Sequence, residues 1–139
     1  MYVTAFRGRR DSYQVPAALA EKNMLDQLIT DIYCKPDIYY LSSFLPHRLR
    51  EKVCNRKEKK VPDHRVHRLW KTVVREYWRH FQGRSKPATY SLFDPAYSEA
   101  AGRRAEKACS DLLLYTPYAW EAFGRKYSHN PQKVLFQYH

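Results

Sequence analysis

The chain has 139 residues, 44% of them hydrophobic and 15% aromatic, which suffices for one domain with its own core and is too short for two ordinary domains. Its net charge is +11, no apolar run approaches the ~20 residues of a membrane span, and no signal peptide is recognisable. The three cysteines are widely spaced, which argues against a disulfide framework and a structural zinc site. These features predict a soluble, cytoplasmic protein.

Short apolar strands alternate with helices along the chain. This alternation favours an α/β, Rossmann-like three-layer domain, in which helices cover both faces of a mainly parallel sheet. Such a sheet binds ligands just beyond the carboxyl ends of its strands. The predicted strands are 2–6, 26–33, 110–115 and 133–138, and the predicted helices are 15–24, 45–54, 64–82, 95–109 and 118–127.

The longest predicted helix, 64–82, has Asp63 as its N-cap and ends before Gly83. Its apolar residues follow the helical period, so we expect them to face the core while a basic face points outward. The apolar set is Val66, Leu69, Trp70, Val73, Val74, Tyr77, Trp78 and Phe81, and the basic set is Arg65, Arg68, Lys71, Arg75 and Arg79.

Almost all of the positive charge belongs to residues 45–86. This segment holds fourteen Lys and Arg against four Asp and Glu, a net +10, whereas the segments on either side are close to neutral. Such asymmetry indicates an anionic partner, which could be nucleic acid, a membrane surface or a phosphorylated small molecule. A solvated outer helix face explains the charge equally well, and the sequence leaves the two interpretations open.

The turn Gly8–Gln14 joins the first strand to the first helix, where nucleotide-binding α/β domains hold phosphates. It has neither a G-x-G-x-x-G pattern nor a Walker A lysine. A plain surface turn is the alternative to a binding loop. The candidate ligand-binding residues are Gly8, Arg9 and Arg10, which suit phosphate or carboxylate groups, and the hydrogen-bonding Asp11, Ser12, Tyr13 and Gln14.

Two further candidates follow later strands. Tyr118 comes just after strand 110–115 and is the residue there that we expect to contact a ligand, whereas Trp120 and Phe123 are interpreted as core. His139 directly follows the last strand and is placed like a site residue, although a terminal histidine can also arise from cloning or truncation.

No metal or cofactor site is predicted. His64 and His67 lie one helical turn apart but lack a third ligand in a basic stretch, so both are interpreted as surface residues. No Ser/His/Asp or Cys/His arrangement and no acid–base pair of carboxylates is recognisable, so no catalytic residue is assigned.

Four blocks of sequence together resemble the amino-terminal domain of a GT-B glycosyltransferase of the group 1, or family 4, kind. The resemblance covers essentially the whole chain. The blocks are Arg9–Glu21 (RRDSYQVPAALAE), Leu28–Asp31 (LITD), Leu113–Phe123 (LLYTPYAWEAF) and Val134–His139 (VLFQYH).

The resemblance implies two Rossmann-like domains that face each other across a cleft. The first domain mainly binds the acceptor and the second the nucleotide-sugar donor. By position, Gly8–Gln14 would reach toward the donor diphosphate and the acceptor, and Tyr118 and His139 would line the cleft. The chain departs from better-known members because its first loop lacks a glycine pair.

The resemblance also implies a missing half. The chain stops after a strand whose end would complete a site, and the donor-binding domain with its paired glutamates, E-x7-E, is not in the sequence. We therefore expect residues 1–139 to be the acceptor-side half of a two-domain enzyme and to be inactive alone, because much of the stabilisation of the leaving diphosphate would come from the other half. Acceptor domains of this kind often dock on anionic membranes, which would make the enzyme peripheral.

Two functions compete with this interpretation. Residues 45–86 could form a basic module that binds nucleic acid, although aromatics predicted to be buried cannot stack on bases, which makes nucleic acid the less favoured partner. The chain could also be a stand-alone, inactive Rossmann-like protein. The sequence does not choose a donor sugar or an acceptor.

Overall fold

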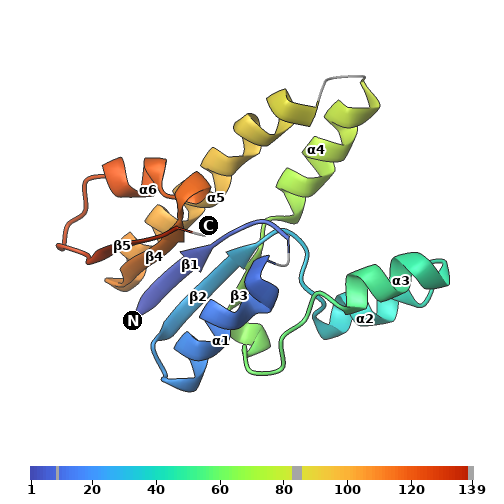
Figure 1. The fold of residues 1–139 in the computed structure, drawn as a ribbon, viewed down its shortest axis with the longest axis horizontal. Coiled ribbons are helices and arrows are strands. Elements are labelled where there is room, and N and C mark those ends of the chain that lie inside the picture. The colour runs from blue at the N-terminus through green and yellow to red at the C-terminus, as the bar shows by residue number, and fades with distance from the viewer. Residues whose placement is uncertain (9, 83–85, 138–139) are drawn as a thin grey trace.

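The structure is a computed structural model that describes the backbone of residues 1–8, 10–82 and 86–137, with side chains except at 10, 76–77, 80 and 86–93. Its centre is a five-stranded, all-parallel sheet with the strand order β3-β2-β1-β4-β5 (Figure 1). This sheet confirms the prediction of an α/β, Rossmann-like domain. The strands are β1 (Tyr2–Ala5), β2 (Leu25–Thr30), β3 (Val66–Arg68), β4 (Asp111–Tyr115) and β5 (Lys133–Phe136).

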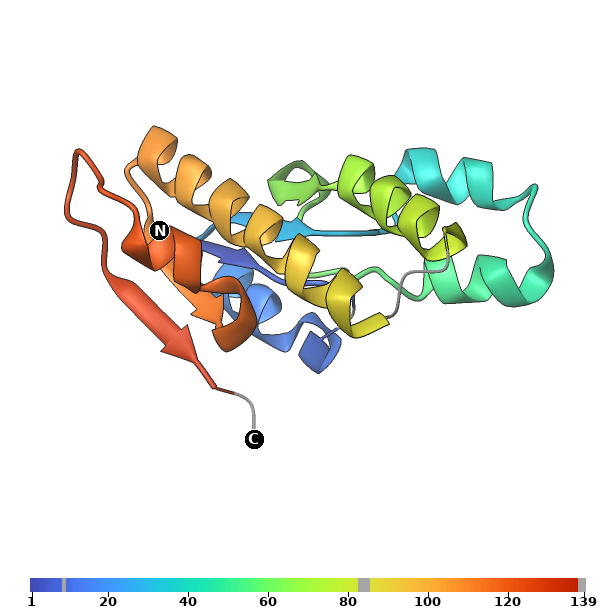
Figure 2. The same ribbon diagram turned by 90° about the horizontal axis from the view of Figure 1, so that it is seen from above.

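Helices cover both faces of the sheet. Helix α1 lies on one face and the long helix α5 crosses the other, while the α2–α3 hairpin extends away from the sheet beyond β3 (Figure 2). Single 3₁₀ turns occupy Arg10–Tyr13, Asp63–Arg65 and Thr116–Tyr118. The α-helices are α1 (Gln14–Glu21), α2 (Pro36–Ser42), α3 (His47–Cys54), α4 (Trp70–Phe81), α5 (Lys86–Ala108) and α6 (Trp120–Gly124).

The core forms because the central strands are buried on both faces. Leu28, Ile29 and Thr30 are successive residues of β2 and are all buried, as expected for a parallel strand between two helical layers. Helix α5 presents Ala101 and Ala105, one turn apart and fully buried, so its backbone can pack closely on the sheet. Apolar burial of this kind is the main stabilising contribution to the domain.

The predicted helix 64–82 is wrong at its start. Val66–Arg68 form β3 instead, paired in parallel with Leu28–Thr30, and the Leu69 N–H donates to the Thr30 carbonyl at 2.8 Å. Helix α4 begins only at Trp70. The physical reason is that pairing with β2 is a long-range contact, which overrides a local helical period.

The prediction that the apolar stripe of this helix is core is also wrong for its outward half. Trp70, Val74, Trp78 and Phe81 are 60%, 57%, 69% and 90% exposed. Helix α4 contacts α5 with its other side, where Val73 is half-buried. A helical period shows which residues share a face, but not whether another element covers that face.

Three further predictions, for Trp120, for Phe123 and for the helix 95–109, differ in outcome. Trp120 was expected in the core but is 84% exposed, because it is the first residue of the short helix α6. Phe123, expected in the core as well, is partly buried and packs against it. The predicted helix 95–109 starts earlier, at Lys86, and continues through Pro95.

Candidate functional site

The carboxyl ends of the five parallel strands meet at one edge of the sheet (Figure 1). The order of the strands changes side between β1 and β4. From β1 the chain adds β2 and then β3 on one side of the sheet, and it then adds β4 and β5 on the other side. In open α/β sheets ligands bind outside the strand ends at such a switch point. The loops that border it here are 6–13 after β1 and 116–118 after β4.

The loop after β1 has an unusual backbone. Gly8 has a φ of 73°, and Asp11, Ser12 and Tyr13 follow with φ values of 41°, 52° and 64°. Three successive non-glycine residues in the left-handed region are strained, and such conformations persist only where the surroundings hold them. The surrounding residues must therefore hold this loop in its strained conformation.

Hydrogen bonds tie this loop to the two neighbouring strand ends. The Gly8 N–H donates to Asp31 Oδ1 at 3.0 Å, and Asp31 Oδ2 pairs with Arg56 Nη1, also at 3.0 Å. On the other side the Tyr115 hydroxyl donates to Asp11 Oδ2 in a short hydrogen bond. The second oxygen of that carboxylate, Asp11 Oδ1, is buried and has no hydrogen-bond partner among the described residues.

Aromatic rings fill the space beneath the loop. The ring of Phe6 lies 5.7 Å from that of Tyr13 and 5.2 Å from that of Tyr115, and Tyr13 lies 5.4 Å from Tyr33, between ring centroids. All four side chains are almost completely buried. The tilted and edge-to-face arrangements are those that aromatic quadrupoles favour. The inner part of the switch point is therefore packed core.

The structure separates the residues predicted for this loop. Asp11 is held by Tyr115, Tyr13 points into the core, and Ser12 and Gln14 are exposed. Gly8 donates its N–H to Asp31. Arg10 is described by its backbone only, and Arg9 lies outside the described residues.

The two later candidates are also separated. Tyr118 is only 3% exposed and packs edge-to-face on Tyr97, with 5.8 Å between ring centroids. Its ring is part of the core, and a ligand could meet it only if the neighbouring turn moved. His139 lies outside the described residues.

A pocket of about 380 Å³ lies beyond the carboxyl ends of β2 and β3, and we call it the β2–β3 pocket. Arg68, the last residue of β3, forms a two-pronged ion pair with Asp37, with N–O distances of 3.1 and 2.5 Å. The hydrogen bonds from Arg68 hold the pKa of Asp37 below its usual value of 3.8. The lining residues are Asp31, Ile32, Asp37, Ile38, Arg68 and Trp70.

Sequence reasoning missed this pocket because it missed β3. With Arg68 and Trp70 on a predicted helix, nothing placed them beside the end of β2. The available signal was Val66, a β-branched residue directly after the turn at Asp63, which is compatible with a short strand. The pocket also touches the loop after β1, since Asp31 both lines it and accepts from Gly8.

A second pocket, of about 530 Å³, lies between α6 and β5, next to the turn after β4. Its lining is almost wholly apolar, and Trp120 and Leu135 form two exposed parts of its wall. This pocket has few polar groups that could orient a polar ligand. It is lined by Thr116, Ala119, Trp120, Phe123, Gly124 and Leu135.

Within the described residues, no three His, Cys, Asp or Glu side chains come together as a metal site would require. No helix in the described part of the chain has the length and apolar character to cross a membrane. In comparisons with protein-family models, curated proteins and solved structures, nothing matches the chain.

Proposed function

We propose that this chain is the acceptor-side domain of a GT-B glycosyltransferase that transfers a sugar from a nucleotide-sugar. The observation that supports the proposal is convergence. The four sequence blocks that resemble such domains lie far apart in the chain, yet each contributes to the carboxyl-terminal edge of the sheet. They supply the loop after β1, Asp31 after β2, the turn after β4, and β5.

The chemistry of this edge suits the acceptor better than the donor. Diphosphates are usually held by glycine-rich backbone at the start of a helix. Here the corresponding space is filled by Phe6, Tyr13 and Tyr115, and the carboxylate of Asp11 accepts a hydrogen bond from the Tyr115 hydroxyl. In this proposal a separate donor-binding domain binds the nucleotide, and the exposed Ser12 and Gln14 line the cleft on the acceptor side.

The test begins with the gene beyond the codon for His139. We expect an open frame, or a neighbouring gene, that encodes a second α/β domain with two glutamates eight residues apart. The complete protein should then transfer labelled sugar from one member of a panel of uridine, guanosine and adenosine diphosphate sugars to a cell extract. The absence of such a domain, or of transfer from every donor, would refute the proposal.

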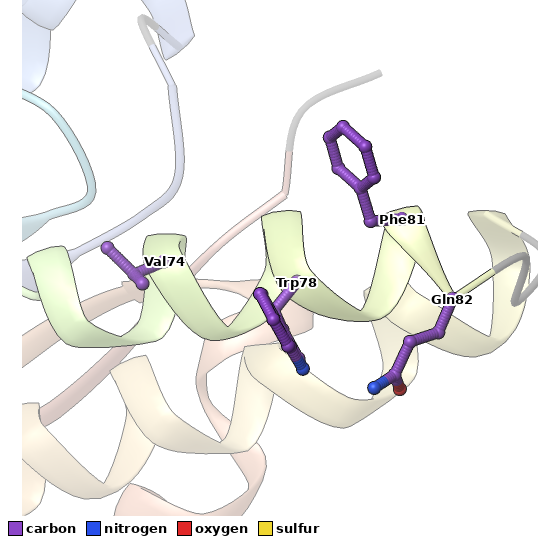
Figure 3. Close-up of a pocket in the computed structure, with 4 residues that line it drawn as sticks. All are labelled: Val74, Trp78, Phe81 and Gln82. Carbon is purple, nitrogen blue, oxygen red and sulfur yellow. The ribbon is translucent and has the colours of Figure 1, made fainter.

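A second candidate function is favoured by the exposed side of α4. Trp70, Val74, Trp78 and Phe81 form an exposed apolar stripe, and Figure 3 shows the last three projecting from the helix. These three and Gln82 line a pocket of about 500 Å³. Exposed Lys71 and Arg75 lie beside them. Basic residues that flank an exposed aromatic stripe are typical of helices that lie in the surface of an anionic membrane.

Nucleic acid is the competing anionic partner. Exposure of Trp70 and Trp78 removes the argument that buried aromatics prevent stacking on bases. However, single-stranded nucleic acids bind in grooves where bases stack on side chains along a basic channel, whereas this stripe belongs to one exposed helix face with Lys71 and Arg75 at its side. We therefore favour the membrane surface for residues 45–86.

Flotation with vesicles distinguishes these partners. The protein should float with vesicles that contain phosphatidylglycerol, and much less with pure phosphatidylcholine. A double variant, Trp78→Ala with Phe81→Ala, should lose most of the binding, whereas Trp120→Ala, which removes an even more exposed tryptophan on α6, should keep it. Preference for a single-stranded oligonucleotide over anionic vesicles, or equal flotation of both variants, would refute membrane docking.

A further inference from the structure

The β2–β3 pocket combines one broad aromatic wall with a polar rim. Trp70 is 60% exposed although it lines a pocket, and Lys71 Nζ lies over its ring at 6.0 Å from the centroid, so a ligand can use the part of the ring that Lys71 leaves open. Ile32 and Ile38 are half-buried and contribute apolar surface. An apolar lining with a few convergent polar groups is the usual composition of a small-molecule site, and about 380 Å³ lies within the usual size range of such sites.

The polar groups of the pocket retain unused hydrogen-bonding capacity. Asp37 accepts from the Ile38 N–H and twice from Arg68, and Asp31 accepts from the Gly8 N–H, the Thr30 hydroxyl and Arg56. The described residues thus fill three of the roughly four acceptor sites of each carboxylate. Arg68 uses two N–H groups, of the roughly five that its guanidinium carries, to bind Asp37. The rim can both donate to a ligand and accept from it.

These polar groups are also held in place. The two-pronged pair fixes the planes of Asp37 and Arg68 relative to each other, and Asp31 is fixed from both sides by Gly8 and Arg56. Groups that are already oriented lose little conformational entropy when a ligand binds. The arrangement therefore suits recognition of several hydroxyl groups with defined directions.

The charged groups at the pocket are already paired. Asp37 pairs with Arg68, and Asp31 Oδ2 lies 3.0 Å from Arg56 Nη1. A phosphate placed here would compete with these carboxylates for their arginine partners, and leaving a charge unpaired in a partly desolvated site is unfavourable. The pocket therefore favours a neutral ligand whose hydroxyl groups use the remaining donor and acceptor positions.

We propose that the β2–β3 pocket binds a neutral saccharide ring, with one apolar face of the sugar against Trp70 and its hydroxyl groups hydrogen-bonded to Asp31, Asp37 and Arg68. A sugar ring has this combination of an apolar C–H face and a polar edge. The identification of this saccharide as the acceptor rests on the proposed glycosyltransferase function; saccharide binding itself does not.

The test measures binding directly, without a transfer reaction. The purified protein is mixed with methyl glycosides of glucose, galactose, mannose and N-acetylglucosamine, and saturation-transfer-difference NMR and calorimetry report binding. Trp70→Ala should weaken the binding of the preferred glycoside at least about tenfold, since it removes the aromatic wall. Trp70→Phe should restore most of the affinity.

The matched control is Trp78→Ala, which removes another exposed tryptophan of the same helix, outside the β2–β3 pocket. It should bind glycosides like the unchanged protein, which would show that losing an exposed tryptophan from α4 does not by itself abolish binding. Inorganic phosphate should not compete with the glycoside. Binding that survives Trp70→Ala, competition by phosphate, or failure of every glycoside to bind would each overturn the proposal.

The two proposals fail in different ways. If the complete protein transfers sugar while Trp70→Ala changes neither glycoside binding nor transfer, the pocket assignment is wrong and the glycosyltransferase proposal stands. If glycosides bind and Trp70→Ala abolishes binding while no donor supports transfer, the pocket is a saccharide site in a protein with another function.

Discussion

The hydrogen bond from Tyr115 to Asp11 is the link between the loop after β1 and the end of β4, and Tyr115→Phe removes it with little other change. The ring remains, so its packing against Phe6 and Phe136, with 5.2 Å between centroids in each case, is kept. What is lost is the donor to a carboxylate whose other oxygen is already buried without a hydrogen-bond partner among the described residues. The variant therefore removes the charge-assisted hydrogen bond to Asp11 and keeps the aromatic ring.

A hydrogen bond to a charged group contributes about 1.5–3 kcal/mol to the free energy of unfolding. We place Tyr115→Phe near 2 kcal/mol, the lower half of that range, because Asp11 is only partly buried and water can replace part of the bond. For a domain of this size such a loss lowers the Tm by roughly 4 to 8 °C. The strained residues of the loop should also exchange their amide hydrogens faster.

Urea unfolding followed by circular dichroism measures the effect, and Tyr2→Phe is its control. Tyr2 is in β1, and its hydroxyl donates to Gln132 Oε1 at 2.7 Å in an exposed position. Loss of this exposed hydrogen bond should cost below about 0.5 kcal/mol. If the two variants lose the same stability, the bond from Tyr115 does not hold the loop, and the account of its left-handed backbone is wrong.

Three further results are expected. Burial, followed by the neighbouring thiol of Cys54, raises the pKa of Cys34 to about 11, so a thiol reagent at neutral pH should label the exposed Cys109 first; simultaneous labelling would contradict this. The pKa of Asp37 is lowered by Arg68, so its stabilisation is present above 3.8 and is lost as the pH falls through the folded value; Asp37→Asn should flatten the acid limb of a stability–pH curve. A Cβ at Gly102 would lie 3.1 to 3.4 Å from three atoms of or near α6, so Gly102→Val should destabilise by about 1–3 kcal/mol in urea unfolding.

Much of the sheet is predictable from local sequence. Residues 2–6 and 110–115 are short apolar runs bounded by turn residues, and both are strands in the structure, β1 and β4. Val3 and Leu112 are fully buried. Runs of this kind are typical of strands covered on both faces, so the parallel arrangement followed from the pattern itself.

Strand β3 could not be predicted from local sequence, because long-range contacts hold it. Strand β3 has three residues, of which His67 and Arg68 are polar, and it exists because β2 offers an edge to pair with. The spacing of apolar residues along the chain does not reveal that the edge of β2 is free to pair with this segment. The same limit explains α4, whose apolar side was recognised correctly but whose neighbours were not, so that Trp78 was expected inside and lies outside.

The loop after β1 lies at the carboxyl-terminal edge of the sheet, as its position in the sequence predicts, but its backbone determines which side chains face outward. The left-handed stretch 11–13 turns Tyr13 inward, where it joins Phe6 and Tyr115 in filling the switch point. A doubly wound sheet usually leaves its crevice at that point. With the crevice occupied by rings, the β2–β3 pocket lies one strand further on, near the α2–α3 hairpin, which extends away from the sheet (Figure 1). Trp70 in the wall of this pocket is 60% exposed. The rings that the strained loop holds therefore close the position between β1 and β4, and the β2–β3 pocket offers Asp31, Asp37 and Arg68 at the same edge of the sheet.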